Sequence, residues 1–497
     1  MIRVLGSPRR LCDGLTRREL LLAGALGMSL RVADFLALKQ VQGAAPTGTL
    51  PSGFGRAKNV ILLYLFGGPS HLEFCDLKPE APVEVRGDLK PIPSTLPGCD
   101  VCEHLPNVAR VMDRVTVVRS LSHHWNFHGM QWATTGMPES SIPLEETQRN
   151  PLHWPYLGSV YTFLKQQAVG PKPAGAVPDN LILPFLLSSR RPAAFYARPH
   201  AAYLGDAFDP IWGEFRGEAT KSMLRMSTGP AAMIRDPYLG VMPEGRFEIT
   251  PDAEVPQDMT LDRLDRRRSL LSQLDETRRA FDDDMAVRTV GRHRETAWSL
   301  LNSQAIREAF DLGREPDLLR DAYGMTLFGQ AALQARRLVE AGCRFVTVIW
   351  DEYGQLNAGW DTHVDHYNRL KNDLLPGFDL AFSALIRDLE ERGLLDETLV
   401  LVMNEMGRTP KLQGNGRGHW GRAYTNLLAG GGVTRGNVIG KTDSIGSDPV
   451  DRPLTAKDIL ATVYHLLGID PHTLLADRLN RPVPLVAYGD IVPEMLA

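Results

Sequence analysis

The chain has 497 residues, 43% of them hydrophobic, which is enough to bury the core of one large domain or of two. Lysine and arginine number 55 and aspartate and glutamate 59, so the formal charge of -4 gives no electrostatic basis for binding nucleic acid or an anionic membrane surface. We therefore expect a folded protein that does not bind nucleic acid.

The N-terminus has the features of an export signal. Arg17 and Arg18 precede a short apolar run at residues 20–30, which is too short to span a bilayer, and small residues at 43–45 offer a cleavage point. The arginine pair resembles the twin-arginine signal of proteins that are exported already folded. Residues 1–45 are predicted to be the signal and cleavage region, which places the mature protein, without an integral membrane span, in the periplasm or outside the cell. An uncleaved amphipathic helix is the alternative.

Short, almost continuously apolar runs predict buried strands at residues 60–66, 115–118, 181–187, 345–350 and 399–403. Between the last two runs, residues 373–395 have apolar positions at helical spacing. Strands this apolar, alternating with a helix, predict an α/β domain with a central, mostly parallel sheet and helices on both faces. We assign residues 46–497 to this domain, with a charged helical insertion around 257–341.

Two cysteines, Cys99 and Cys102, are separated by two residues in a predicted tight loop. In an oxidising compartment they could close a small disulfide, or they could remain free thiols. A zinc ribbon would require a second such pair, which the sequence lacks.

Side chains capable of chemistry follow several of the predicted strands, and in a parallel sheet ligands bind beyond the carboxyl ends of the strands. The first loop contains Ser70, His71, Glu73 and Asp76; the second Ser122, His123, His124 and His128; the fourth Asp361, His363, Asp365 and His366; and the fifth Glu405 and Arg408, with His419 further along. We expect these loops to meet at one edge of the sheet and to form the functional site.

Ordered motifs in these loops resemble the bacterial family called domain of unknown function 1501, which belongs to the alkaline phosphatase-like superfamily with sulfatases and phosphomutases. The motifs are GGPSH (67–71), EHLPNVARVMDRVTVVRS (103–120), GWDTH (359–363), NEMGRTP (404–410), GHW (418–420) and AGGGVTRGNVIGKTD (429–443). The resemblance covers most of the mature chain. It implies an exported, metal-dependent hydrolase of a phosphate or sulfate ester, with a small molecule or a polysaccharide as the substrate.

The resemblance also implies a metal site made by Asp361, His419 and either His363 or His366. We favour His363, because residues two apart in an extended segment point to the same side. Three nitrogen and oxygen ligands with an open position suit a catalytic divalent metal. Zinc is the expected ion, with calcium or manganese as alternatives.

A second metal site is incomplete by the same comparison. Glu405, Met406 and Gly407 stand where the superfamily has Asp-His-Gly, and a thioether is a poor ligand for such ions. Glu405 is our candidate for a further ligand, and Glu73 or Asp76 could also compensate.

The nucleophile is the most divergent part of the pattern, because the position of the sulfatase nucleophile falls close to Asn126, which cannot attack an ester. Ser70 and Ser122 are the alternatives, and a metal-bound water would need no side-chain nucleophile. His128 is the candidate base or a further ligand, and Arg408 could pair with the anionic group of the substrate. The alternative function is a catalytically degenerate protein that retains a metal and serves in binding or assembly in the cell envelope.

Overall fold

The computed structural model describes residues 51–173, 175–191, 196–225, 232–249, 303–354 and 359–497. The predicted signal at 1–45 and the first part of the predicted insertion lie outside the described residues. The part of the insertion that is described contains α8 (Gln304–Phe310), α9 (Asp317–Tyr323) and α10 (Leu327–Glu340). Among the described residues, none of the helices combines the length and apolarity that a bilayer span requires.

A nine-stranded sheet lies at the centre of the described residues, in the order β15-β4-β14-β11-β1-β10-β5-β6-β9. Its strands are β1 (Asn59–Leu65), β4 (Val115–Leu121), β5 (Asn180–Leu183), β6 (Ile211–Arg216), β9 (Arg246–Ile249), β10 (Phe345–Trp350), β11 (Thr398–Met403), β14 (Tyr424–Ala429) and β15 (Asn437–Ile439). Strand β1 runs parallel to both neighbours, β10 and β11, and only β14 and β9 run against the others. This arrangement confirms the predicted mostly parallel α/β sheet.

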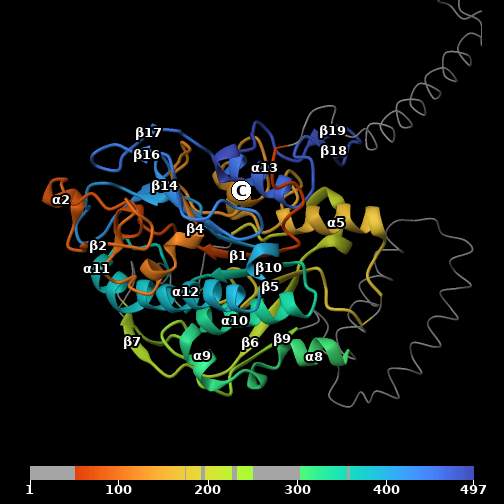
Figure 1. Ribbon diagram of the computed structural model, residues 1–497, viewed down its shortest axis with the longest axis horizontal. Coiled ribbons are helices and arrows are strands. Elements are labelled where there is room, and N and C mark those ends of the chain that lie inside the picture. The colour runs from red at the N-terminus through yellow and green to blue at the C-terminus, as the bar shows by residue number, and fades with distance from the viewer. Residues whose placement is uncertain (1–50, 174, 192–195, 226–231, 250–302, 355–358) are drawn as a thin grey trace, which may run out of the picture. The chain divides into compact units, whose positions relative to one another are not determined.

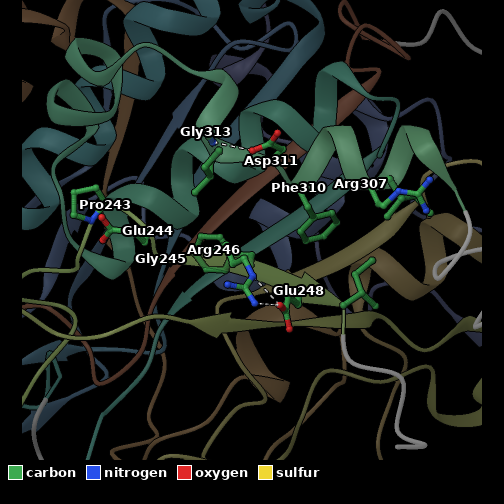
Figure 2. A pocket seen from close by; sticks show the side chains of 13 residues that line it. Pro243, Glu244, Gly245, Arg246, Glu248, Arg307, Phe310, Asp311 and Gly313 are labelled. Carbon is green, nitrogen blue, oxygen red and sulfur yellow. Dashed lines mark hydrogen bonds and ion pairs between the residues drawn. The ribbon is translucent and has the colours of Figure 1, made fainter. Parts of the chain in front are cut away.

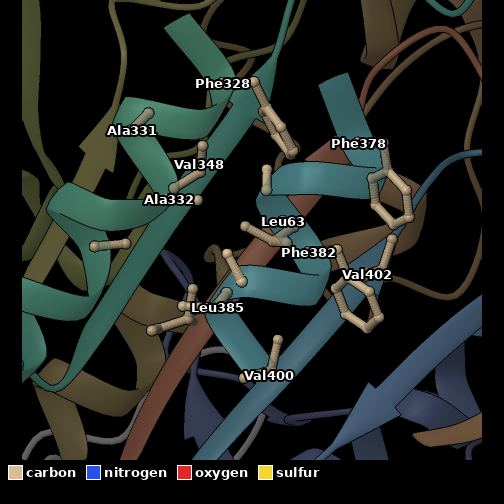
Figure 3. Close-up of a cluster of buried hydrophobic side chains, with 14 of the residues drawn as sticks. Leu63, Phe328, Ala331, Ala332, Val348, Phe378, Phe382, Leu385, Val400 and Val402 are labelled. Carbon is tan, nitrogen blue, oxygen red and sulfur yellow. The ribbon is translucent and has the colours of Figure 1, made fainter. Parts of the chain in front are cut away.

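Helices cover both faces of the sheet (Figure 1). On one face, Ile61, Leu63 and Leu65 of β1 pack with α10 and α12 (Leu375–Glu391), as Figure 3 shows around Leu63. On the other face, the alternate β1 residues pack with α5 (Leu157–Val169) and α13 (Ala456–Leu466). Successive side chains of a strand point to opposite faces, so a strand buried on both faces must be continuously apolar.

The strand ends differ from the predicted ones for local reasons. The run predicted at 181–187 stops at Leu183, since Pro184 has no amide hydrogen with which to continue the ladder. Strand β4 extends beyond the predicted end to Leu121. Cys99 and Cys102 are both buried free thiols.

The remaining elements are short. The helices are α2 (Val83–Arg86), α3 (Gln131–Thr134), α4 (Ile142–Glu146) and α11 (His366–Arg369), and the small antiparallel pairs are β2 (Pro91–Ile92) with β3 (Val101–Cys102), β7 (Ser222–Arg225) with β8 (Ala232–Arg235), β12 (Gly407–Arg408) with β13 (His419–Trp420), β16 (Lys441–Thr442) with β17 (Pro449–Asp451), and β18 (Leu474–Ala476) with β19 (Pro482–Pro484). The loops that leave β1, β4, β10 and β11 meet at one edge of the large sheet. The β12–β13 pair joins them there, because β14 enters the sheet from that edge.

Candidate metal centre

A cluster of one carboxylate and three imidazoles lies at this edge. Ligand atoms of His128, Asp361, His363 and His419 all lie within 4.8 Å of one another. His128 comes from the loop after β4, Asp361 and His363 follow β10, and His419 belongs to β13. The structure thus brings together residues from three loops that the sequence analysis had singled out.

Asp361 is the centre of the cluster. Its Oδ2 lies 3.2 Å from His128 Nε2, and its Oδ1 lies 3.0 Å from His363 Nε2 and 3.3 Å from His419 Nε2. The Nε2 atoms of His363 and His419 are 2.9 Å apart. Asp361 and His128 are buried, whereas His363 and His419 are partly exposed, so the cluster can be reached from solvent on the histidine side.

The donor set fits a divalent metal ion. Imidazole nitrogen and carboxylate oxygen are ligands that zinc prefers. His419 Nδ1 donates a hydrogen bond to the carbonyl oxygen of Asn126 at 3.0 Å, which directs Nε2 toward the cluster. Burial lowers the pKa of His419, which favours the neutral imidazole that a metal requires.

Glu405 lies behind His128. Its Oε1 is 3.0 Å from His128 Nδ1 and also accepts a hydrogen bond from the amide of Gly67 at 2.7 Å. Burial alone would lower the pKa of His128, but the carboxylates of Asp361 and Glu405 outweigh it and raise the pKa to about 9, so a metal ion bound by His128 would displace a proton from it. Glu405, predicted as a ligand, stands outside the group of four and orients His128, as an outer carboxylate commonly orients a metal-bound histidine.

Arg408 is fully buried and its donors are engaged by the protein. It donates to the carbonyl oxygens of Gly67, Gly68 and Arg417 and to Asp361 Oδ1, the last at 2.5 Å. Although burial would raise the pKa of Asp361, Arg408 and His128 hold it well below its usual range. Arg408 therefore fixes the glycine turn against the ionised Asp361, and these bonds compete with the predicted pairing to a substrate anion.

Two predicted candidates lie in a separate buried network. His366 Nε2 is 3.3 Å from Glu73 Oε2, and its Nδ1 is 2.7 Å from Thr362 Oγ1. Ser70 also lies beside Glu73, whose pKa falls to about 2 because Arg417 and His366 outweigh the effect of burial. Of the two histidines that the sequence analysis left open, the structure brings His363 rather than His366 to Asp361.

Substituting Gly67 tests how tightly the glycine turn supports the cluster. Gly67 has a φ of +109°, and an added Cβ would lie 2.5 Å from the amide nitrogen of Asp361. Gly67→Ala should therefore lower the free energy of unfolding by about 3 kcal/mol or more, from strain and overpacking together, and should weaken zinc binding. Gly393→Ala is the control, because Gly393 has a φ of +68° but open space around its Cβ, so only about 1 kcal/mol is expected. Equal losses in urea unfolding would contradict this interpretation.

A cavity of about 630 Å³ contains none of the predicted site residues. It lies between β9 and α8, and charged side chains such as Arg246, Glu248 and Asp311 stand around it (Figure 2). A smaller cavity, of about 470 Å³, includes Ser122 and Asn126 and lies beside the cluster.

The protein is an α/β protein with a His/Asp cluster at the carboxyl edge of its central sheet, and the comparisons identify its family. Residues 57–496 match the family described as "Protein of unknown function (DUF1501)", so the chain belongs to this family and the resemblance predicted from the motifs is confirmed. No curated protein matches the chain.

Several solved structures are similar at low identity. They include the sulfatase PsFucS1 from Pseudoalteromonas sp. (12% identity, 89% of this chain and 72% of that chain covered, TM-score 0.33), the lipoteichoic acid synthase LtaP from Listeria monocytogenes (9%, 91% and 80%, 0.35) and the phosphonate monoester hydrolase SpPMH from Silicibacter pomeroyi (12%, 84% and 74%, 0.29).

Proposed function

We propose that this protein is a metal-dependent hydrolase of a phosphate or sulfate ester. Asp361, His363, His419 and His128 would hold one divalent ion, zinc being the expected one. The observation that carries the proposal is the convergence of these four donors within 4.8 Å at the carboxyl edge of the sheet. That edge is where parallel α/β sheets bind their ligands.

When bound at this cluster, a divalent cation would act as a Lewis acid and lower the pKa of water. The chain's own residues supply the rest. Asp361 provides the negative charge, Glu405 and the Asn126 carbonyl set the orientation of His128 and His419, and Arg408 keeps Asp361 ionised. Such preorganisation limits the rearrangement needed on metal binding.

The attacking group in this proposal is water. Ser70 lies beside Glu73, in the network that also holds His366, and Ser122 lines the neighbouring cavity. A serine nucleophile needs a base or a metal within hydrogen-bond reach. Direct attack by water needs no side-chain nucleophile, which agrees with asparagine at position 126.

A second candidate function is a metal-retaining binding or assembly protein of the cell envelope. It is favoured by the engagement of Arg408 with main-chain oxygens and Asp361, which leaves that cation occupied within the protein. For either function we infer export through the twin-arginine pattern in residues 1–45, to the periplasm or the extracellular space.

The experiment that separates these functions measures metal content and hydrolysis on the same sample. We expect about one zinc ion per chain by elemental mass spectrometry, and hydrolysis of 4-nitrophenyl phosphate or 4-nitrophenyl sulfate that a chelator removes and zinc restores. Ser70→Ala and Ser122→Ala should each retain this activity, whereas a hydrolase with either serine as its nucleophile would lose it in the corresponding variant. Bound metal without hydrolysis of either ester would favour the binding protein, and folded protein that takes up no zinc, calcium or manganese would exclude both functions.

A further inference from the structure

The cavity of about 470 Å³ beside the cluster is formed by three segments of the chain. Its volume falls within the roughly 300–1,000 Å³ typical of small-molecule sites. It is lined by Ser122, His123, His124 and Asn126 from the loop after β4, by Arg422 from the turn before β14, and by Asp448 and Pro449 near the start of β17. We call it the β4 cavity.

The wall of the β4 cavity is shared with the metal centre. The carbonyl oxygen of Asn126 accepts the hydrogen bond from His419 Nδ1, while its Oδ1 accepts from the amide of Gly421 at 2.8 Å. His123 Nε2 lies 2.6 Å from the carbonyl oxygen of Glu405, whose carboxylate orients His128. A molecule in this cavity would therefore lie against two residues that position the metal ligands.

Hydrogen bonds and ring packing fix the tautomer and the orientation of His123 in this wall. The amide of Trp125 donates to His123 Nδ1 at 3.1 Å, so His123 Nε2 must carry the proton that is donated to Glu405. Trp132 and Tyr424 pack edge-on against the His123 ring, at centroid distances of 5.7 and 5.4 Å. His123 thus presents a fixed, neutral surface to the cavity.

The arginine and the aspartate that line the β4 cavity pair with each other. Arg422 Nε donates to Asp448 Oδ1 at 2.6 Å, and Asp448 Oδ2 also accepts from Ser447 at 2.8 Å. Ser122 and the Asn126 amide add uncharged donors and acceptors. A polyanion would need several uncompensated cations, whereas a group rich in hydroxyls matches alternating donors and acceptors.

We propose that the β4 cavity binds the alcohol part of the ester and that this part is a neutral, polyhydroxylated group, a sugar residue. The inference rests on the proposed function, because it assigns the anionic end of the substrate to the metal centre and the neutral end to the adjoining cavity. The Arg422–Asp448 pair and the Asn126 amide are the groups that would contact the sugar hydroxyls.

The test removes the ion pair without changing the net charge. Arg422→Ala/Asp448→Ala should lower kcat/KM for glucose 6-sulfate and glucose 6-phosphate at least tenfold more than for the 4-nitrophenyl esters. Both side chains are partly exposed, which favours retention of the fold. The control is Arg435→Ala/Asp396→Ala, another exposed pair, with 3.0 Å between Arg435 Nη2 and Asp396 Oδ1, which should leave the ratio unchanged. Equal losses for sugar and 4-nitrophenyl esters in the cavity variant would overturn the proposal.

A binding measurement separates this inference from the proposed function. Saturation-transfer NMR with glucose, galactose and N-acetylglucosamine should show contact with the wild-type protein, and this contact should disappear in the cavity variant. Contact without ester hydrolysis would reject the hydrolase but retain the sugar site. Failure of all three sugars to bind the wild type, or equal binding to the cavity variant, would reject the sugar site even if the 4-nitrophenyl esters are hydrolysed.

Discussion

Asp361→Asn should reduce bound zinc from about one ion per chain to background and abolish ester hydrolysis. Asp361 is the one carboxylate in the cluster and contacts all three histidines. Asparagine keeps the size of the side chain but loses its negative charge. Because loss of an outer-sphere partner already costs about 10–100-fold in metal affinity, loss of this ligand should cost more. Elemental mass spectrometry after dialysis, with chelator competition for affinity, measures the effect.

The matched control for this variant is Asp365→Asn in the same segment. Asp365 has a φ of 53°, a left-handed conformation that asparagine adopts readily, and its Oδ1 accepts a hydrogen bond from Asn368 outside the cluster. It should retain the metal. An Asp361→Asn protein that still holds one zinc ion per chain would show that the centre is assigned to the wrong residues.

Arg408→Met should destabilise the metal-free protein by about 3–5 kcal/mol, which is the range measured when one partner of a buried ion pair is removed. The variant leaves the buried Asp361 carboxylate and the carbonyl oxygens of Gly67 and Gly68 without their guanidinium donor. Urea unfolding in the presence of a chelator measures the loss. Zinc should then restore part of the stability, because an ion that binds only the folded protein shifts the equilibrium toward it.

An exposed arginine provides the comparison for Arg408. Arg435 pairs with Glu390 and Asp396 at the surface, and its replacement by methionine should change stability by about 0–1 kcal/mol. If Arg408→Met also cost less than about 1 kcal/mol, the buried bonds of Arg408 would not stabilise the turn as we argue.

The central strands were predictable because they are buried on both faces and therefore continuously apolar, as in β1, β10 and β11. The outer strand β6 was missed because it is only partly buried and its sequence, IWGEFR, mixes polar and apolar residues. Strand β14 was also missed, since its sequence YTNLLA begins with polar positions that are nevertheless buried. A run of apolar residues indicates a buried strand, so this pattern does not detect a strand that contains polar residues.

From the residues alone, the candidate centre was predictable as a set of side chains in loops at one edge. The family resemblance then singled out Asp361, His419 and His363 or His366 among them. Spacing in an extended segment favoured His363 over His366, and the structure does bring His363 to Asp361. His366 follows the left-handed Asp365, in α11, and lies beside Glu73 instead. The supporting contacts involve main-chain atoms, such as the Asn126 carbonyl oxygen and the Gly67 amide, which carry no signal in a residue pattern. Likewise, the charge of Arg408 is visible in the sequence, but the carbonyl oxygens that engage it are not.

The late position of His419 in the chain, just before the antiparallel strand β14, limits when the centre can form during synthesis. Strand β14 separates β4 from β11, and the segment leading into it delivers His419, whose partner Asn126 is 293 positions earlier in the chain. A contact between such distant parts of a chain closes a long loop, and the entropy lost in that closure precedes the stabilisation that the contact gives. A nascent chain that has not yet released residue 419 from the ribosome therefore lacks one of the four donors. An ion that all four donors hold would be bound only after this residue has emerged.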